Sequence, residues 1–304
     1  MPAFREGPVR VRVPASSANL GPAFDYAGLA LAMYDDLEAE VVDGADLSIN
    51  VVGESADRVP LDRRHMVVRT IDDTFRAIGL QPPDGLRLLA RNTIPHGRGL
   101  GSSAAAIAAG LVLARELLVD GNDVLPDEKL FDLGTEMEGH PDNISASLFG
   151  GFTLSWVDGS HAQHVSLLVH ESIQPVVVLP GGTLPTKKAR AMLPTQVPHA
   201  DAAFNAGRAA LLVRAMTEQP ELLFAATDDR LHQQQRRSAM PESLQIVDAL
   251  RSAGIPAAVS GAGPSVLVFA TSESAPLVAA LAGQGNTTLH LQVAYDGVLE
   301  SVTI

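Results

Sequence analysis

The first ninety residues alternate apolar and polar positions in short segments that predict β-strands. Residues 9–17 place valines between arginines, as a half-exposed strand does. Residues 37–42 and 47–52 predict two more strands around the turn "DGAD", and residues 85–94 predict a fourth. Residues 65–79 instead carry apolar side chains at helical spacing and end on a glycine, which predicts a helix.

The rest of the chain contains more helix. The alanine-rich residues 104–118 give the clearest helical pattern, and residues 126–138 predict a helix that stops at the turn "GHPDN". Residues 150–156 and 174–180 predict strands, and residues 201–254 are mainly helical. The last segments predict a strand-turn-strand unit, a helix and a strand, at residues 255–270, 275–282 and 288–293.

Length and composition fit a folded protein with two lobes. The chain has 304 residues, which suffices for two lobes that share an interface. Hydrophobic residues make up 46% of it, so a large core is expected and disorder is not. We expect one lobe over residues 1–160 and the other over residues 161–304.

Charge and cysteine content exclude several classes of function. The net charge is −13, whereas non-specific nucleic-acid binding needs a basic face. The absence of cysteine excludes disulfides, cysteine–zinc sites and thiol catalysis, and it favours a reducing compartment. The first residues lack a signal-peptide pattern, and no run of about 18 apolar residues predicts a membrane span. We expect a cytoplasmic protein that binds neither nucleic acid nor membrane.

A glycine-rich loop, "PHGRGLGSS", joins the strand at residues 85–94 to the alanine-rich helix. It is no Walker A loop, because it lacks lysine, and no dinucleotide fingerprint, because a serine replaces the third glycine. Its three glycines allow a ligand to approach the backbone, and the start of the helix attracts an anion. Ser102 and Ser103 could cap the helix, bind a phosphate oxygen or ligate Mg²⁺. A glycine turn with an ordinary serine cap is the alternative interpretation.

Two more glycine–serine segments accompany this loop, "PASSANLGPAFDYAGLAL" at residues 14–31 and "SGAGPSVLVF" at residues 260–269. The trio, with Pro-x3-Gly-Leu-Gly-Ser-Ser in the middle, resembles the GHMP kinases, which are kinases of small molecules. "SANLGPAFD" and "EGHPDN" resemble the homoserine kinase branch in particular. The chain departs from the family at Ala23, often glycine, and at Ala262, often serine, where one contact to phosphate or loop would be lost.

The resemblance implies both a fold and a reaction. The implied fold is α+β, with an N-terminal lobe like domain 2 of ribosomal protein S5 and a ferredoxin-like C-terminal lobe. The implied reaction is ATP-dependent phosphorylation of the L-homoserine hydroxyl to O-phospho-L-homoserine, with ADP as second product, in threonine biosynthesis. Mg²⁺ would accompany ATP, and a homodimer is possible. Another small alcohol of the mevalonate type, or a non-catalytic amino-acid or nucleotide sensor on the same fold, remains open.

The resemblance also implies residues for ATP and metal. The implied ATP-binding residues are Pro95, His96, Gly97, Arg98, Gly99, Leu100, Gly101, Ser102, Ser103, Ala104 and Ala105. Mg²⁺ takes few protein ligands, chiefly carboxylate or hydroxyl oxygens. We expect Ser103 and Glu136 to hold it, with Glu138 as the alternative, because both glutamates cannot share one helix face. Lys187 or Lys188 would help to neutralise the phosphates.

Homoserine carries an ammonium, a carboxylate and a hydroxyl, and a selective site must match all three. We expect Asp25 to bind the ammonium and Asn19 to orient the hydroxyl, although both residues also suit a turn. Arg190 and Arg236 are the candidates for the carboxylate, because arginine binds it with two parallel hydrogen bonds. Spacing from the preceding "LH" and the following proline favours Arg236 over Arg237.

The remaining candidates flank these residues. Thr186 lies one helical turn before Arg190 and could share its face. In the turn "HPDN", Asn143 could hold the hydroxyl or a γ-phosphate oxygen, and His140 could contact the substrate. Asp142 is a candidate base, with direct proton transfer to the phosphate as the alternative. The expected catalytic residues are therefore Asn19, Asp142 and Asn143.

Overall fold

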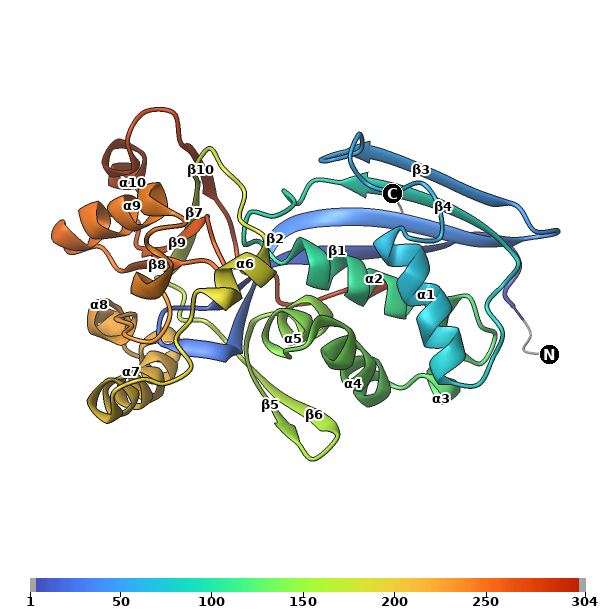
Figure 1. The fold of residues 1–304 in the computed structure, drawn as a ribbon, viewed down its shortest axis with the longest axis horizontal. Coiled ribbons are helices and arrows are strands. Elements are labelled where there is room, and N and C mark those ends of the chain that lie inside the picture. Colours follow the sequence, from blue (N-terminus) through green and yellow to red (C-terminus); the bar gives the residue numbers. More distant parts are fainter. Residues whose placement is uncertain (1–3, 301–304) are drawn as a thin grey trace.

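A computed structural model describes residues 4–300 of the chain and divides them between two sheets, each with helices packed on it (Figure 1). The strands of the first sheet are β1 (Val9–Asn19), β2 (Ala23–Val42), β3 (Leu47–Gly53), β4 (Gly85–Asn92), β5 (Phe152–Asp158), β6 (His161–Leu167) and β11 (Leu299–Glu300). The helices of this lobe are α1 (Met66–Ala77), α2 (Ser102–Glu116), α3 (Gly121–Val124), α4 (Asp127–Glu138) and α5 (Asp142–Phe149).

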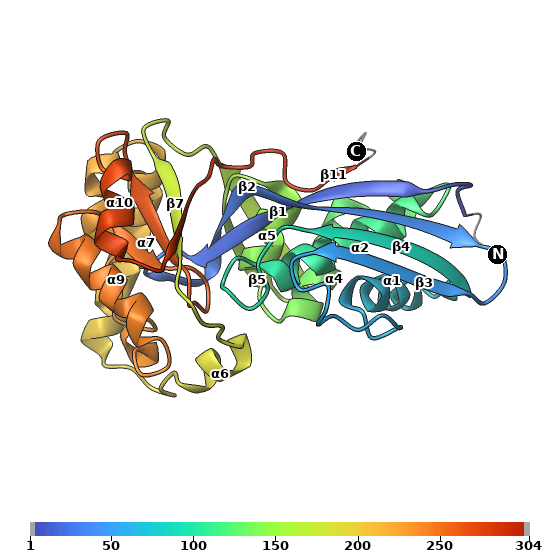
Figure 2. The same cartoon turned by 90° about the horizontal axis from the view of Figure 1, so that it is seen from above.

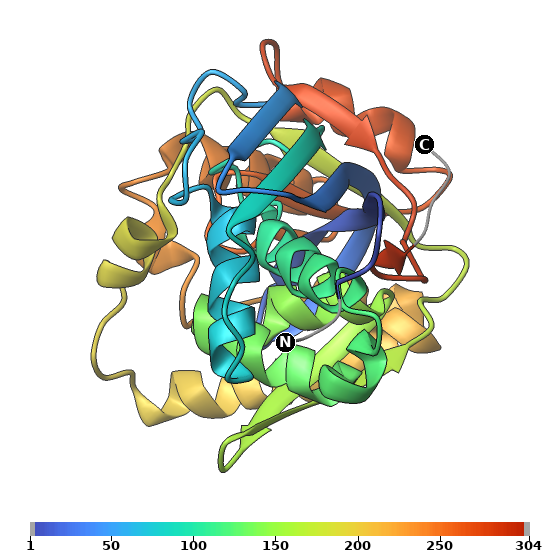
Figure 3. The ribbon, with the colours of Figure 1, turned by 90° about the vertical axis from the view of Figure 1, so that its right-hand side faces the viewer.

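Strand β2 organises the first sheet. It pairs with β1 along most of its length, with β5 near its start and with β4 near its end, so the sheet order is β11-β1-β2-β4-β3 with β5 and β6 branching from β2. Only β3 and β4 pair in parallel among the described strands. The helices cover one face of this sheet, as the views from above and from the end show (Figures 2 and 3).

The second lobe contains a smaller antiparallel sheet. Its order is β10-β7-β9-β8. The strands are β7 (Gln174–Leu179), β8 (Ala257–Val259), β9 (Val266–Ala270) and β10 (Thr287–His290). The helices are α6 (Thr186–Ala191), α7 (His199–Thr217), α8 (Leu223–Ala226), α9 (Pro241–Ser252) and α10 (Ala275–Ala282), with the short 3₁₀ turns η1 (Pro220–Leu222) and η2 (Gln234–Arg236). The predicted α+β class with two lobes is confirmed.

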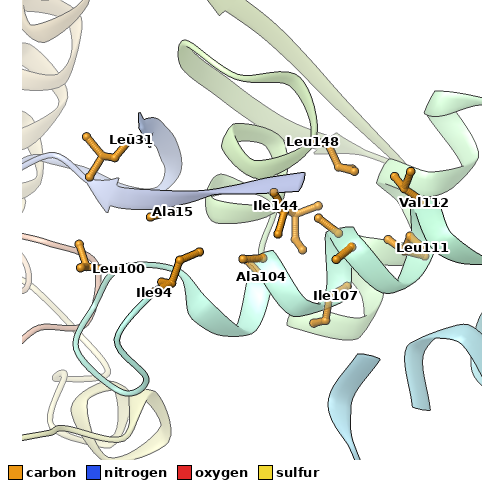
Figure 4. Close-up of a cluster of buried hydrophobic side chains, with 14 of the residues drawn as sticks. Ala15, Leu31, Ile94, Leu100, Ala104, Ile107, Leu111, Val112, Ile144 and Leu148 are labelled. Atoms are coloured by element: carbon orange, nitrogen blue, oxygen red, sulfur yellow. The ribbon is translucent and has the colours of Figure 1, made fainter. Parts of the chain in front are cut away.

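Helix α2 is the centre of the first core. Its short alanine side chains let it lie deep between α1, α5 and β1, where Ala104 and Ile107 contact a buried apolar cluster (Figure 4). Gly110 has the same function on the α1 side, since a Cβ there would lie only 2.6 Å from the Cβ of Thr70. This packing fixes the start of α2, and therefore the glycine loop, relative to the sheet.

Two local predictions were wrong. The segment "GHPDN" is not only a turn, because helix α5 begins at Asp142, and residues 161–167 form the strand β6, which the pattern did not indicate. The division after residue 160 stays a prediction; it falls in the turn between β5 and β6, and the chain leaves the first sheet after Leu167. No helix within residues 4–300 is long and apolar enough to cross a membrane.

Candidate active site

The glycine loop has the bare backbone that its sequence predicts. Gly97, Gly99 and Gly101 have φ angles of 66°, 77° and 67°, in the left-handed region that favours glycine. Helix α2 follows directly, with Gly101 at its N-cap and no side chain capping it. The interpretation of Ser102 or Ser103 as an ordinary helix cap is therefore wrong, and the Oγ of Ser103 instead donates to a carboxylate of α4.

The three glycine–serine segments meet at this loop. The Oγ of Ser260 lies 2.6 Å from the carbonyl oxygen of Gly99 and 2.8 Å from the Oγ of Ser17. A Cβ on Gly99 would overlap the carbonyl oxygen of Ser260 and lie 3.0 Å from that of Gly263. Glycine at position 99 is thus needed for contact with the third segment, so a side chain there would disturb the protein itself as well as any ligand.

A cavity of about 150 Å³ opens beside the loop, between the two lobes. The predicted residues that line it are Asn19, Asp25, Gly97, Gly99, Gly101, Ser102, Ser103, His140, Asp142, Asn143, Thr186, Arg190 and Arg236. Phe24, Leu184 and Gly261 also line it and were not predicted. Residues more than two hundred positions apart in the chain therefore share one small cavity.

Other predicted ATP-binding residues lie elsewhere. Leu100, Ala104 and Ala105 are buried in the core behind the loop, so their side chains support it. Pro95, His96 and Arg98 line a separate, polar cavity of about 480 Å³, and His96 also lines the more apolar cavity described below. Lys187 and Lys188 are exposed on α6. The roles of these residues toward ATP stay predictions.

Opposite charges from the two lobes meet across the cavity. The Nη1 and Nη2 atoms of Arg190, on α6, donate to the two carboxylate oxygens of Asp25, on β2, over 2.8 and 2.7 Å. The ring of Phe24 packs beneath both arginines, 5.5 Å from the Cζ of Arg190 and 5.6 Å from that of Arg236. The two predicted groups for the ammonium and the carboxylate thus bind each other when no substrate is between them.

Arg236 is the buried member of the arginine pair. Its side chain is 2% exposed, and its Nε donates to the carbonyl oxygen of Ala189 over 3.2 Å. Burial and the nearby charge of Arg190 lower the pKa of Arg236 to about 10. Arg237 instead pairs with Asp248 on the surface, at 2.9 Å. Arg236 lines the cavity and Arg237 does not, and the role of Arg236 toward a substrate stays a prediction.

Asn19 holds the loop that carries Asp25. Both residues have positive φ angles, 70° and 66°, which few side chains other than asparagine and aspartate tolerate. The Nδ2 of Asn19 donates to the carbonyl oxygen of Gly261 over 3.0 Å, and its Oδ1 accepts from the backbone N–H of Asp25 over 3.0 Å. The amide therefore links the first segment to the third, and the contact with the hydroxyl stays a prediction.

The start of helix α5 brings three polar residues to the same cavity. Asp142 is almost fully buried, and its Oδ1 accepts from the Nδ1 of His140 at 2.5 Å and from the backbone N–H of Asn143 at 2.7 Å. Burial alone would lower the pKa of His140, but its hydrogen bond to Asp142 and the nearby carboxylates outweigh burial and raise that pKa. A positively charged imidazole is thus favoured at the wall of the cavity.

The structure corrects the choice of glutamate. Glu138 lines the cavity and its Oε2 accepts from the Oγ of Ser103 over 2.9 Å, whereas Glu136 is exposed on the other side of α4. Burial raises the pKa of Glu138, although the hydrogen bond from Ser103 opposes this. One carboxylate and one hydroxyl beside the glycine loop fit Mg²⁺, which commonly takes one or two protein ligands and its remaining ligands from phosphates and water.

A second, more apolar cavity of about 250 Å³ lies on the other side of Ser102 and Ser103. Its apolar walls are Val13, Leu37, Val59, Pro60, Met66, Val67, Ala90 and Ala106. These side chains come from three strands, two helices and a loop of the first lobe, and no motif marks them. Their spacing resembles that of ordinary core residues, so sequence reasoning did not find this cavity.

The polar residues that line this space, besides the two serines, are Asp35, Arg64, His65, Asn92 and His96, and two of them have distinctive surroundings. His65 is 5% exposed and its buried Nδ1 has no hydrogen-bond partner within residues 4–300. Asp35 accepts two backbone hydrogen bonds on its Oδ1, from Thr93 over 2.6 Å and from Ile94 over 2.9 Å. Burial raises the pKa of Asp35 to about 6. A ligand here would meet a flat apolar slot with a few polar groups, the usual character of a small-molecule site.

Comparison with known proteins identifies the family. The family model for the GHMP kinases N-terminal domain matches residues 65–151, and that for the GHMP kinases C-terminal domain matches residues 202–284. The chain belongs to the GHMP kinase family. Within it, the homoserine kinase of Streptomyces avermitilis is 54% identical over 93% of this chain and 92% of its own length. That of Streptomyces coelicolor is 52% identical over 97% and 99%.

Solved structures show the same fold. The homoserine kinase of Cytophaga hutchinsonii superimposes with a TM-score of 0.82 at 24% identity, covering 99% of both chains. The mevalonate diphosphate decarboxylase of Enterococcus faecalis superimposes with a TM-score of 0.67 at 14% identity, covering 97% of this chain and 99% of its own. The fold is therefore shared by relatives with different substrates, and the choice of substrate rests on the residues of the cavity.

Proposed function

We propose that this chain phosphorylates the side-chain hydroxyl of L-homoserine with ATP, giving O-phospho-L-homoserine and ADP for threonine biosynthesis. The observation that carries this proposal is the cavity between the lobes, where Asp25, Arg190 and Arg236 surround a space beside the phosphate-binding loop. An α-amino acid presents one ammonium and one carboxylate, which match one aspartate and two arginines. Relatives of about half identity over nearly the whole chain are homoserine kinases.

The substrate would enter by exchange with the ion pair between Asp25 and Arg190. Its ammonium would take the place of Arg190 at Asp25, and its carboxylate would bind the guanidinium groups of Arg190 and Arg236. Every charge then keeps a partner during binding. An alcohol without the ammonium would leave Asp25 without one, and such a mismatch is the strongest source of discrimination that a polar site offers.

ATP would span the two cavities. Both are lined by Ser102 and Ser103, so an adenine in the apolar cavity would direct its phosphates across the start of α2 to the substrate. The free Nδ1 of His65, the carboxyl group of Asp35 and the side chains of Asn92 and His96 are polar groups that could bind the base. The backbone N–H groups at the start of α2 would bind phosphate oxygens.

Ser103 and Glu138 would hold Mg²⁺ with the phosphates. When bound, Mg²⁺ would supply positive charge to neutralise the negative charge that develops on the phosphates during transfer. In this chain, the position of Glu138 is fixed by its hydrogen bond from Ser103, and His140, whose pKa is raised by its hydrogen bond to Asp142, lies across the same cavity. The metal, a homodimer and a cytoplasmic location stay predictions.

Phosphoryl transfer asks the protein mainly for orientation and charge neutralisation. The hydroxyl oxygen forms a bond to the γ-phosphorus as the bond from that phosphorus to ADP breaks. The hydroxyl proton passes either to Asp142 or directly to a γ-phosphate oxygen. Because His140 and the N–H of Asn143 both bind Oδ1 of Asp142, only the other carboxylate oxygen has capacity to accept it.

Coupled measurement of ADP release tests the proposal. The protein is given Mg-ATP with L-homoserine, L-serine, L-threonine, mevalonate or no acceptor, and the product is identified by ³¹P NMR. We expect kcat/KM for homoserine to exceed that of every other acceptor by about 10²-fold or more, because polar mismatch is strongly penalised. Preferential turnover of mevalonate would indicate another small-alcohol kinase, and homoserine binding without ADP release would indicate a sensor.

A further inference from the structure

Behind the wall of the substrate cavity lies a fully buried histidine, His232, between helix α8 and the 3₁₀ turn η2. It does not line the cavity, but its two ring nitrogens connect parts of the site from both lobes. The Nε2 atom lies 2.7 Å from the carbonyl oxygen of Gly21, in the segment between Asn19 and Asp25. The Nδ1 atom lies 3.2 Å from Nη1 of Arg236.

These two partners define the protonation of the ring. A guanidinium can only donate, so the Nδ1 of His232 must accept from Arg236 and carry no proton. A carbonyl oxygen can only accept, so Nε2 must carry the proton that it donates to Gly21. One neutral tautomer satisfies both contacts, and a charged imidazole would satisfy only one.

The segment that carries His232 is held by Asp229. The Oδ2 of Asp229 accepts from the backbone N–H groups of His232, over 3.1 Å, and of Gln233, over 2.9 Å. Its Oδ1 accepts from the side chain of Asn205 over 3.0 Å. The face of the ring packs near Phe24, with the ring centres 5.2 Å apart. The imidazole is therefore fixed in place before any substrate binds.

The contacts of Arg236 show what this fixed ring does. Its Nε donates to the carbonyl oxygen of Ala189, and its Nη1 lies 3.2 Å from His232 and 3.3 Å from the carbonyl oxygen of Gly261. Its Nη2 makes no hydrogen bond to any part of residues 4–300. Two of the three guanidinium nitrogens, Nε and Nη1, thus bind protein, and Nη2 remains for a ligand in the cavity.

We propose that His232 is a positioning residue: it holds Arg236 with Nη2 free for the substrate carboxylate, and it fixes that arginine relative to the segment carrying Asp25. Asp25, which would bind the ammonium, and Arg236, which would bind the carboxylate, would then be held at a fixed distance from each other. This inference rests on the proposed function. Turnover of homoserine by the unaltered protein tests that function first and independently.

Three substitutions separate the two contacts of the ring. His232→Asn places an amide oxygen near the position of Nδ1 and keeps the acceptor for Arg236. His232→Gln places an amide nitrogen near the position of Nε2 and keeps the donor to Gly21, and His232→Leu keeps neither. For Gln and Leu we expect KM for homoserine to rise about 10-fold or more, because a hydrogen bond to a charged group is lost. For Asn we expect a rise below about threefold, and KM for ATP should stay within about twofold in all three.

Equal rises for the Asn and Gln variants, or equal rises in KM for both substrates, would overturn the proposal, since a purely structural role predicts that result. If the variants do not fold, ¹⁵N NMR of the histidine-labelled parent protein gives a second test. It should show a proton on Nε2 and none on Nδ1 of His232, with the Nδ1 resonance shifting when homoserine binds. A protonated Nδ1 would exclude acceptance from Arg236 and contradict the proposal.

Discussion

The two cavities that meet at Ser102 and Ser103 are built in opposite ways. The substrate cavity is lined by charged side chains, and its walls come from both lobes, with Asp25 on β2 facing Arg190 on α6. The cavity assigned to adenine is mostly apolar, and its walls come from the first lobe alone. Charge placed across an interface selects one substrate, whereas an apolar slot within one lobe can accept the same nucleotide for many substrates.

This difference predicts that the two substrates respond to separate substitutions. Changes on the C-terminal side of the substrate cavity should affect homoserine and leave ATP binding unchanged. Changes in the apolar slot should do the reverse. Substitutions at Ser103 or Glu138, close to where the two cavities meet, should lower kcat, the rate at saturating ATP and homoserine.

The largest effect is expected for Arg236→Ala. Removing a buried cation opposite a carboxylate should lower kcat/KM for homoserine by about 10²–10³-fold, because the carboxylate would be left without its buried partner. The KM for ATP should change little. Arg237→Ala is the matched control, since its side chain pairs with Asp248 on the surface. Steady-state kinetics on both variants checks this, and equal losses would show that Arg236 does not read the carboxylate.

Glu138→Gln should have the second-largest effect on activity. Loss of the carboxylate beside Ser103 should lower kcat by about 10- to 100-fold and raise the Mg²⁺ concentration needed for half-maximal turnover. Glu136→Gln is the control, because Glu136 is exposed and does not face the cavity. Titration of Mg²⁺ at saturating ATP measures both variants. A larger effect of Glu136→Gln than of Glu138→Gln would contradict the assignment of Glu138 as the metal ligand.

Ala106→Leu tests the apolar slot. The larger side chain would enter the cavity from α2, and overpacking of this kind should raise KM for ATP by about 10-fold. The KM for homoserine in the same variant is the internal control and should stay within about twofold. A rise in KM for homoserine without one for ATP would place the nucleotide elsewhere.

The last prediction concerns the stability of the ligand-free protein. The pKa of Asp35 is raised from 3.8 to about 6, so its folded-state carboxyl keeps a proton that the unfolded chain loses first. The free energy of unfolding should therefore fall as pH rises from about 4 to about 6. Asp35→Asn keeps the Oδ1 acceptor for Thr93 and Ile94 and removes the buried charge.

The Asn variant should be more stable than the parent above pH 6, by up to about 3 kcal/mol, and no different near pH 4. Urea unfolding of the ligand-free protein at several pH values measures this. A variant less stable than the parent at pH 7 would show that the charged carboxylate is favoured at this site.

Most of the fold could be predicted from the sequence, because the strands and helices that form the core have a regular spacing of apolar residues. Strand β6 was missed because "HAQHVSL" has only a weak apolar alternation, and the start of α5 was missed because Gly139 and Pro141 indicate a turn. The loop and the charged residues of the substrate cavity were found because they lie in compact motifs. The apolar cavity was not, since single residues from separate elements look like core.

The choice between Glu136 and Glu138 failed for a related reason. Helical periodicity places the two on different faces but cannot say which face meets the glycine loop, because that depends on how α4 packs against α2. His232 shows the same limit: its motif is readable, but its contact with Gly21, from the far end of the chain, is a product of the fold.

The most direct test of the account compares homoserine with 4-hydroxybutyrate, which lacks the amino group, on the parent protein and on Asp25→Ala. The parent should use 4-hydroxybutyrate poorly, and the substitution should impair homoserine far more than the analogue. The ratio of the two losses in kcat/KM, a double-mutant-type comparison, should be about 10-fold or more. A ratio near one would mean that Asp25 does not read the ammonium, and the reading of the cavity as an amino-acid site would be contradicted.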